Sequence, residues 1–134
     1  MDSLTDISAI REILNRHGFR FSKSLGQNFL INPAVCPRMA RECGADGETG
    51  VIEVGPGIGV LTRELALRAK KVVAVELDRR LLPVLSETLD GFGNVSVISG
   101  DILKIDLNEL VAREFPDGKA VLCANLPYYI TSPV

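Results

Sequence analysis

The sequence has little of what metal and redox centres need, with one histidine and three cysteines in 134 residues. The cysteines, Cys36, Cys43 and Cys123, form no C-x-x-C pair, which favours buried free thiols over a metal or redox role. His17 lies just before Gly18, where a helix is expected to end, and no neighbouring pattern suggests catalysis. We therefore assign no metal site.

Long hydrophobic runs are also missing. No apolar stretch approaches the roughly 18 residues that a membrane-spanning helix requires. The first residues, Met-Asp-Ser-Leu-Thr-Asp, lack the basic and apolar regions of a secretory signal. Apolar residues make up 46% and charged residues 24% of the chain, as in globular rather than disordered proteins. We expect a cytoplasmic globular protein without a membrane partner.

The chain carries no large excess of charge, since its formal net charge is −2. This balance argues against a strongly basic nucleic-acid-binding module. The charge is uneven along the chain, with +3 over residues 1–41 and −5 over residues 42–134. The basic residues of the first part are Arg11, Arg16, Arg20, Lys23, Arg38 and Arg41. On charge alone, a solvated surface explains them.

Short apolar strands alternate with helices from residue 50 onwards. The expected strands cover 51–54, 72–75, 95–98 and 120–124, and the helices between them about 59–69, 79–90 and a short segment that Asp106 and Glu109 begin as a capping box. This alternation predicts βαβ units and a parallel sheet. Pro83 predicts that the first turn of its helix is kinked or not fully helical. Two helices, over 6–16 and about 33–43, precede the strands, with an ordered loop over 19–31 between them.

A glycine-rich turn, Glu53-Val54-Gly55-Pro56-Gly57-Ile58-Gly59, follows the first expected strand. The dinucleotide fingerprint G-x-G-x-x-G is not matched, because Val60 takes the place of its third glycine, and this counts against a pyrophosphate cofactor. Glu76 lies 21 residues after Gly55, near the offset of a ribose-binding acid. The pattern favours S-adenosylmethionine, with Glu53 near its positive end and Glu76 on its ribose. A tight turn without a ligand is the alternative.

Two further motifs follow the third and fourth strands. In Gly100-Asp101-Ile102, the Asp101 carboxylate can accept a hydrogen bond from an adenine amino group, although Gly-Asp alone is more often a turn or a cap. In Asn125-Leu126-Pro127-Tyr128, the Asn125 carbonyl can hold an exocyclic amine, Pro127 stiffens the backbone and Tyr128 offers a ring for stacking. An ordinary proline turn is the alternative. The convergence of these motifs on one sheet edge favours an active site.

Together with Ser24-Leu25-Gly26-Gln27-Asn28-Phe29-Leu30, these motifs resemble the ribosomal RNA adenine dimethyltransferase family, in the family's order over residues 24–128. The resemblance is closest to the branch that forms N6,N6-dimethyladenosine in small-subunit rRNA. Leu126 favours that branch over the erythromycin-resistance methyltransferases of large-subunit rRNA. It implies an α/β, Rossmann-like class I methyltransferase fold and direct in-line methyl transfer from S-adenosylmethionine, without a covalent nucleophile.

The resemblance also implies roles for individual residues. Those implied to contact the cofactor are Asn28, Leu30, Gly55, Glu76, Asp101 and Asn125. Asn125, Pro127 and Tyr128 are implied to be catalytic, because they hold and stack the target adenine. The implied partner is ribosomal RNA in a small-subunit precursor, and the basic N-terminal segment becomes part of the RNA path.

The resemblance further implies that residues 1–134 are the N-terminal part of the catalytic domain, with helices and a loop over 1–49 and a βαβ core over 50–134. The family's later strands and its helical C-terminal RNA-binding domain are expected to be missing. The expected strand order 3-2-1-4 leaves residues 120–124 at an open edge, which predicts self-association of this chain, whereas the parent is expected to be a monomer. We expect the chain alone to methylate rRNA poorly or not at all.

Two other functions stay open on the sequence. One is a nucleic-acid-binding relative that keeps the fold without turnover, against which the intact Asn125 and Tyr128 argue weakly. The other is a methyltransferase that acts on DNA or on protein amines, since N-x-P-Y-type motifs also occur there. The segment over residues 24–30 argues against this second alternative.

Overall fold

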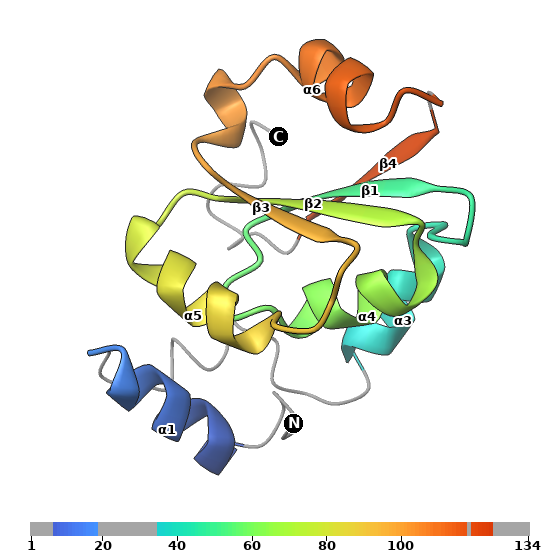
Figure 1. The fold of residues 1–134 in the computed structure, drawn as a ribbon. Helices are drawn as coiled ribbons and strands as arrows, with labels where there is room; N and C mark the ends of the chain where they lie inside the picture. Colours follow the sequence, from blue (N-terminus) through green and yellow to red (C-terminus); the bar gives the residue numbers. More distant parts are fainter. Residues whose placement is uncertain (1–6, 19–34, 118, 125–134) are drawn as a thin grey trace.

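Four parallel strands form a single sheet in the computed structural model of the chain, which describes residues 7–18, 35–117 and 119–124 (Figure 1). The strands are β1 (Gly50–Val54), β2 (Lys71–Glu76), β3 (Val95–Ser99) and β4 (Ala120–Ala124). They lie in the order β3-β2-β1-β4, and all three pairings are parallel. The predicted order 3-2-1-4 and the α/β class are confirmed.

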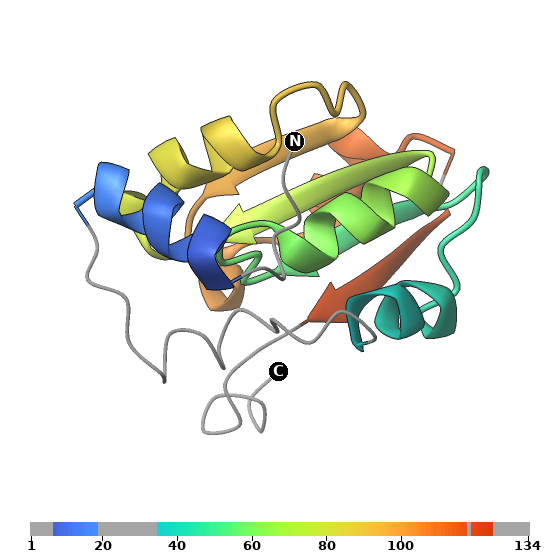
Figure 2. The ribbon, with the colours of Figure 1, turned by 90° about the horizontal axis from the view of Figure 1, so that it is seen from below.

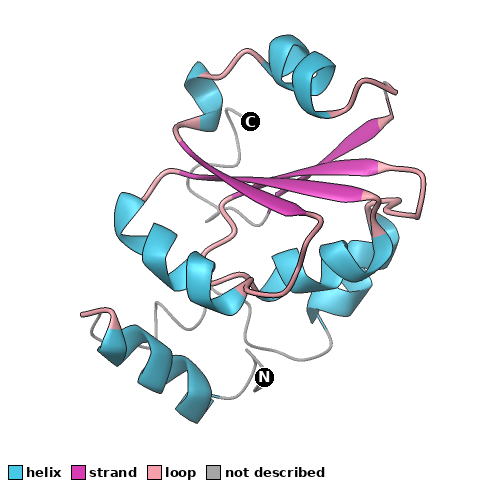
Figure 3. Ribbon diagram, in the orientation of Figure 1, coloured by secondary structure: helices cyan, strands magenta, loops and turns pink. Residues whose placement is uncertain are grey.

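Helices cover both faces of the sheet (Figures 1 and 3). On one face lie α3 (Val35–Glu42), α4 (Val60–Arg68) and α5 (Leu82–Thr88), and on the other lies α6 (Leu107–Glu114). Because β4 lies on the far side of β1 from β2, a right-handed crossover carries α6 to the opposite face. Two short 3-10 helices, η1 (Arg79–Leu81) and η2 (Ile102–Lys104), follow β2 and β3. The sheet therefore lies between two helical layers.

The first helix, α1 (Ile7–Arg16), lies outside α5, near the edge of the sheet at which the strands end (Figures 1 and 2). Figure 2 also shows α5 over β3 and α3 beside β4. The side chains of Ile10 and Leu14 are fully buried, as the predicted apolar stripe requires. α1 thus belongs to the same core as the sheet.

Neighbouring strand residues point to opposite faces, so the sheet has two cores. Val51 and Val72 pack with Leu65 of α4 in the larger core. Ile52 packs in the second core with Leu110 of α6. The two central strands, β1 and β2, are therefore buried on both faces, which explains their nearly continuous apolar sequences.

The predicted helix over 79–90 begins as a 3-10 turn and becomes α-helical at Leu82, with Pro83 in its first turn. Asp78 caps this turn, since its carboxylate accepts the Arg80 N–H at 3.0 Å. The expected break near Pro83 is confirmed.

The expected cap of the last helix is also present. The Asp106 carboxylate accepts the Glu109 N–H at 3.2 Å at the start of α6. α6 then ends at Glu114, before Pro116, as predicted. The acidic pair therefore marks a true helix start.

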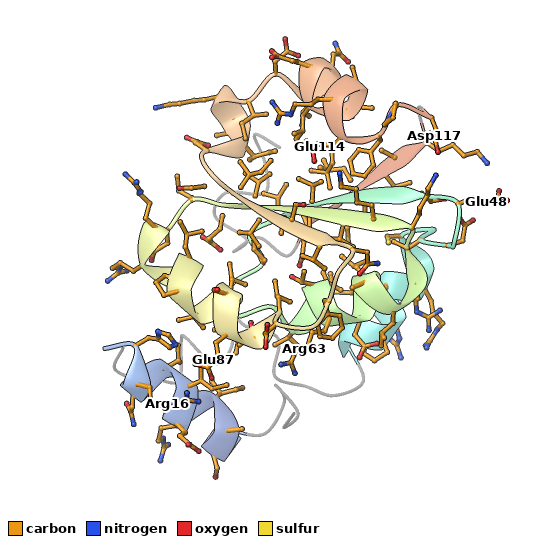
Figure 4. All side chains as sticks on the ribbon, in the orientation of Figure 1. Arg16, Glu48, Arg63, Glu87, Glu114 and Asp117 are labelled. Carbon is orange, nitrogen blue, oxygen red and sulfur yellow. The ribbon has the colours of Figure 1, made fainter. Side chains whose placement is uncertain are left out.

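One carboxylate fastens α1 to α5. Arg16 donates two hydrogen bonds to Glu87, at 3.0 and 2.7 Å, and the His17 Nε2 lies 3.0 Å from Glu87 Oε1 (Figure 4). These contacts lower the pKa of Glu87, the hydrogen bond with His17 being the largest cause. His17 therefore has a structural partner 70 residues away in sequence, which no local pattern could reveal.

Cys123 is buried and Cys43 is half-buried, and neither of them forms a disulfide. The described residues contain no group of three or more His, Cys, Asp and Glu side chains placed to hold a metal ion. Within the same parts of the chain, every helix is too short or too polar to cross a membrane.

Candidate functional site

A left-handed glycine turn connects β1 to α4 at the carboxyl end of the sheet. Gly55, Gly57 and Gly59 have φ angles of 71°, 61° and 95°, a region that side chains other than glycine rarely adopt. The Gly55 N–H donates to the Val75 carbonyl at 3.0 Å and so joins the turn to β2. The glycines are therefore required by the backbone path of the turn itself.

Glu76, the last residue of β2, lies against this turn. Its Oε1 accepts the Gly57 N–H at 3.1 Å, and its Oε2 accepts the Asp78 N–H at 2.8 Å. Burial raises the pKa of Glu76, while the hydrogen bonds from these N–H groups lower it. A carboxylate oxygen that accepts one N–H keeps room for a second donor. Glu76 can therefore hold the turn and still accept hydroxyl groups of a ligand.

Asp101 follows β3 at the same edge of the sheet. The Gly100 N–H donates to the Glu76 carbonyl at 3.0 Å, which joins the Gly-Asp turn to the end of β2. The half-buried Asp101 carboxylate accepts the Leu103 N–H at 2.9 Å and caps η2. The structure thus brings Gly55, Glu76 and Asp101 together on three adjacent strand ends.

Several predicted site residues lie outside the described residues: Asn28, Leu30, Asn125, Pro127 and Tyr128. Their roles stay predictions. β4 ends at Ala124, whose partner in β1 is Val54, the residue before the glycine turn. The Asn125–Tyr128 motif begins at the next position of the sequence.

Glu53 lies within β1, beneath the turn, and has no exposed surface. The Thr62 hydroxyl of α4 donates to its Oε1, and among the described residues its Oε2 has no hydrogen-bond partner. Burial raises the pKa of Glu53 to about 8, an effect that Thr62 opposes and the nearby Glu76 carboxylate strengthens. The carboxyl is therefore protonated at neutral pH.

This burial leaves Glu53 no surface for direct contact with a ligand, while its expected place near the positive end of the cofactor stays a prediction. A side chain without exposed surface makes no direct contact with a bound molecule in this arrangement. Any effect of Glu53 on a ligand has to act through the turn above it or through electrostatic interaction. The sequence could not show this, because an acid before a glycine turn is compatible with both orientations.

Two threonines that the sequence analysis missed support the turn from below. Thr62 is fully buried and bonds Glu53. A Cβ added at Gly59 would lie 3.0 Å from the Thr88 Oγ1, so α5 packs closely on the turn. The Arg63 Nε donates to the Thr88 carbonyl at 2.9 Å and joins α4 to α5. A signal for Thr62 was its place three residues after Gly59, in the first turn of an otherwise apolar buried helix face.

The chemistry of this edge fits a nucleoside cofactor without phosphate groups. Glu76 offers acceptors suited to hydroxyl groups, and the glycine turn leaves the backbone open to close approach. The carboxylates of Glu76 and Asp101 disfavour an anionic diphosphate. S-adenosylmethionine has a ribose diol and a cationic sulfur, so the described residues fit it.

Comparisons with known proteins agree with this geometry. Residues 18–134 match the family model described as ribosomal RNA adenine dimethylase. The chain is 50% identical over 135 aligned residues to the ribosomal RNA small subunit methyltransferase A of Bacillus thuringiensis (strain Al Hakam), covering all of this chain and 46% of that protein. The chain thus spans about half the length of the curated relatives it matches.

Two solved structures are similar as well. A dimethyladenosine transferase from Plasmodium falciparum is 30% identical with a TM-score of 0.60, over 76% of this chain and 34% of that one. The 23S rRNA methyltransferase ErmE is 39% identical with a TM-score of 0.53, over 56% of this chain and 31% of that one. The fold is the Rossmann-like fold of S-adenosylmethionine-dependent methyltransferases.

Proposed function

Because the chain belongs to the ribosomal RNA adenine dimethylase family, we propose that it forms the S-adenosylmethionine-binding part of an enzyme that dimethylates adenine N6 in small-subunit rRNA. The observation that carries the proposal is the position of Glu76, whose carboxylate lies against the glycine turn at the carboxyl end of the sheet. In open α/β sheets, ligands bind at this edge. The small-subunit precursor as partner and the cytoplasm as compartment belong to the same proposal.

The bound cofactor would supply the methyl group. Glu76 would bind its ribose hydroxyls, and Asp101, half-buried beside the end of β2, would accept a hydrogen bond from its adenine amino group. Asn125, Pro127 and Tyr128 would hold and stack the target adenine. Adenine N6 is a poor nucleophile because its lone pair is delocalised, so rate enhancement rests on orientation more than on acid–base chemistry.

A large-subunit rRNA substrate is the competing proposal, since ErmE is among the similar structures. The small-subunit relative matches the whole chain at 50% identity, whereas ErmE matches 56% of it at 39% identity. Leu126 in the Asn125–Tyr128 motif also favours the small-subunit branch. The small-subunit substrate is therefore preferred.

The proposal is tested by calorimetric titration of this chain with S-adenosylmethionine, using Glu76→Ala as the variant. Loss of hydrogen bonds to a charged acceptor costs about 1.5–3 kcal/mol each, so we expect the dissociation constant to rise at least tenfold. The matched control is Glu48→Ala, an exposed glutamate at the opposite edge of the sheet (Figure 4).

Thermal unfolding of both variants shows whether Glu76→Ala acts on binding or on folding, because Glu76 also holds the turn. If Glu76→Ala is folded and its dissociation constant for S-adenosylmethionine is unchanged, Glu76 does not bind the cofactor. If the unaltered chain does not bind the cofactor, these 134 residues do not suffice to form the pocket.

A further inference from the structure

Glu53 is a buried acid that the proposed function does not use. It has no exposed surface, its Oε1 has the Thr62 hydroxyl as donor, and its Oε2 has no partner among the described residues. An ionised carboxylate in such a place lacks both water and a cation, so the neutral form is favoured. The free protein therefore holds a proton at Glu53.

Several elements that pack around β1 contribute groups near Glu53. α4 contributes Thr62, and the carboxylate of Glu76 on β2 repels negative charge at Glu53. On β4, Cys123 is its partner in register, and it is buried. On α5, the Thr88 hydroxyl lies against Gly59 of the turn above. Among the described residues, Glu53 thus interacts with the Thr62 hydroxyl and with the Glu76 carboxylate.

A cation bound at the turn changes this balance. Glu53 is two residues before Gly55, and it interacts electrostatically with Glu76, the residue placed on the ribose. At an effective dielectric constant near 20, a unit charge about 10 Å away changes an ionisation equilibrium by roughly tenfold. A positive charge at the turn therefore favours the carboxylate form of Glu53.

We propose that Glu53 distinguishes the methyl donor from the spent cofactor by charge: binding of S-adenosylmethionine releases the Glu53 proton to solvent, and binding of S-adenosylhomocysteine does not. The inference rests on the proposed function, because it assumes that the cofactor binds at this turn. S-adenosylmethionine carries a sulfonium, whereas the sulfur of S-adenosylhomocysteine is a neutral thioether. The O–H bond of the carboxyl breaks, the carboxylate remains beneath the turn, and no other bond changes.

Proton linkage makes the consequence measurable. A ligand whose complex holds fewer protons binds more tightly as pH rises. For a coupling of the size above, the affinity for S-adenosylmethionine relative to S-adenosylhomocysteine rises about tenfold between pH 6.5 and pH 9. S-adenosylhomocysteine therefore competes with S-adenosylmethionine most effectively at low pH.

The experiment measures the dissociation constants of both ligands from pH 6.5 to pH 9 for the unaltered chain and for Glu53→Gln. The glutamine mimics the neutral acid in shape but carries no dissociable proton. The ammonium groups of the ligands can also lose protons over this pH range. This contribution is present in Glu53→Gln as well, so the difference between the two proteins isolates Glu53.

We expect the affinity ratio to rise with pH about tenfold more in the unaltered chain than in Glu53→Gln. Equal pH profiles in the two proteins overturn the inference while leaving cofactor binding intact. If neither ligand binds, the proposed cofactor function of this chain fails, and the inference fails with it. The two failures are therefore distinguishable.

Two further measurements keep the test decisive if Glu53→Gln folds poorly. Calorimetry of the unaltered chain in buffers of different ionisation enthalpy counts the protons released, and more are expected with S-adenosylmethionine than with S-adenosylhomocysteine. Thr62→Val removes the donor that favours the carboxylate, so the midpoint of the pH profile should move to higher pH. Equal proton release with both ligands, or an unmoved midpoint, contradicts the inference.

Discussion

At the scale of the residue, the glycine turn depends on side chains from four elements, β1, β2, α4 and α5. Glu76 accepts the Gly57 N–H from above, and Thr88 lies against Gly59 from below. Glu53 lies under both with its bond to Thr62. Each of these side chains is buried, so the shape of the turn depends on packing as well as on glycine.

The buried Glu53 also predicts how stability depends on pH. Its pKa is about 8 in the folded protein, against 4.5 as the ordinary value, so the folded state retains a proton that the unfolded state releases above pH 4.5. The stabilisation by this proton is complete below pH 4.5 and is lost as pH rises through about 8. Within this window the free energy of unfolding falls by about 1.4 kcal/mol per pH unit through this group.

Glu53→Gln has no such proton, and it should gain stability relative to the unaltered chain between pH 6 and pH 8. Urea unfolding at these two pH values measures the gain. Glu64→Gln, a partly exposed glutamate on α4, is the control and should follow the unaltered chain. Parallel pH profiles of Glu53→Gln and the unaltered chain would show that the carboxyl is ionised in the folded state.

At the scale of the element, the start of β1 and the end of α6 share one close contact. A Cβ built at Gly50 would lie 2.1 Å from Cδ1 of Phe115, which is buried. Phe115 follows α6 and packs in the core with Ile52. The glycine therefore provides the space that lets α6 cover this face of the sheet.

Gly50→Ala should accordingly destabilise the protein by about 1–3 kcal/mol, because overpacking displaces a buried ring. Gly47→Ala is the matched control, since nothing lies within 4 Å of a Cβ at that position. Chemical denaturation of both variants measures the difference. A Gly50→Ala protein as stable as Gly47→Ala would mean that the Phe115 ring moves aside without cost.

At the scale of the whole molecule, the described sheet has an apolar edge. β4 pairs on one side with β1, and Leu122 on it is 47% exposed. An edge strand with exposed apolar side chains can pair with another chain. The predicted self-association through residues 120–124 thus remains a prediction with a structural basis.

Leu122→Lys should shift the chain towards the monomer, because a charge on an edge strand opposes pairing. Sedimentation velocity over a range of protein concentrations measures the change. Leu67→Lys is the control, since Leu67 is 72% exposed but lies on α4, away from this edge. If the unaltered chain stays monomeric at high concentration, the predicted self-association through residues 120–124 is wrong.

The strand order 3-2-1-4 was implied by the resemblance to the family, and the structure confirms it. The sequence by itself determined the element order, since short apolar runs and caps such as Asp78 and Asp106 mark the strands and the helix starts. It also determined that Gly55, Glu76 and Asp101 follow parallel strands and so reach one edge. These features follow from local periodicity and spacing, which neighbouring residues encode.

Only the tertiary structure decided what each acid faces. Glu53 and Glu76 both belong to buried strands, yet Glu53 points to Thr62 beneath the turn and Glu76 to the N–H groups of the turn itself. The Glu87 carboxylate contacts the side chains of Arg16 and His17, which lie 71 and 70 residues earlier in the sequence. Burial and ionisation depend on groups brought together from distant parts of the chain, so they are absent from any local pattern.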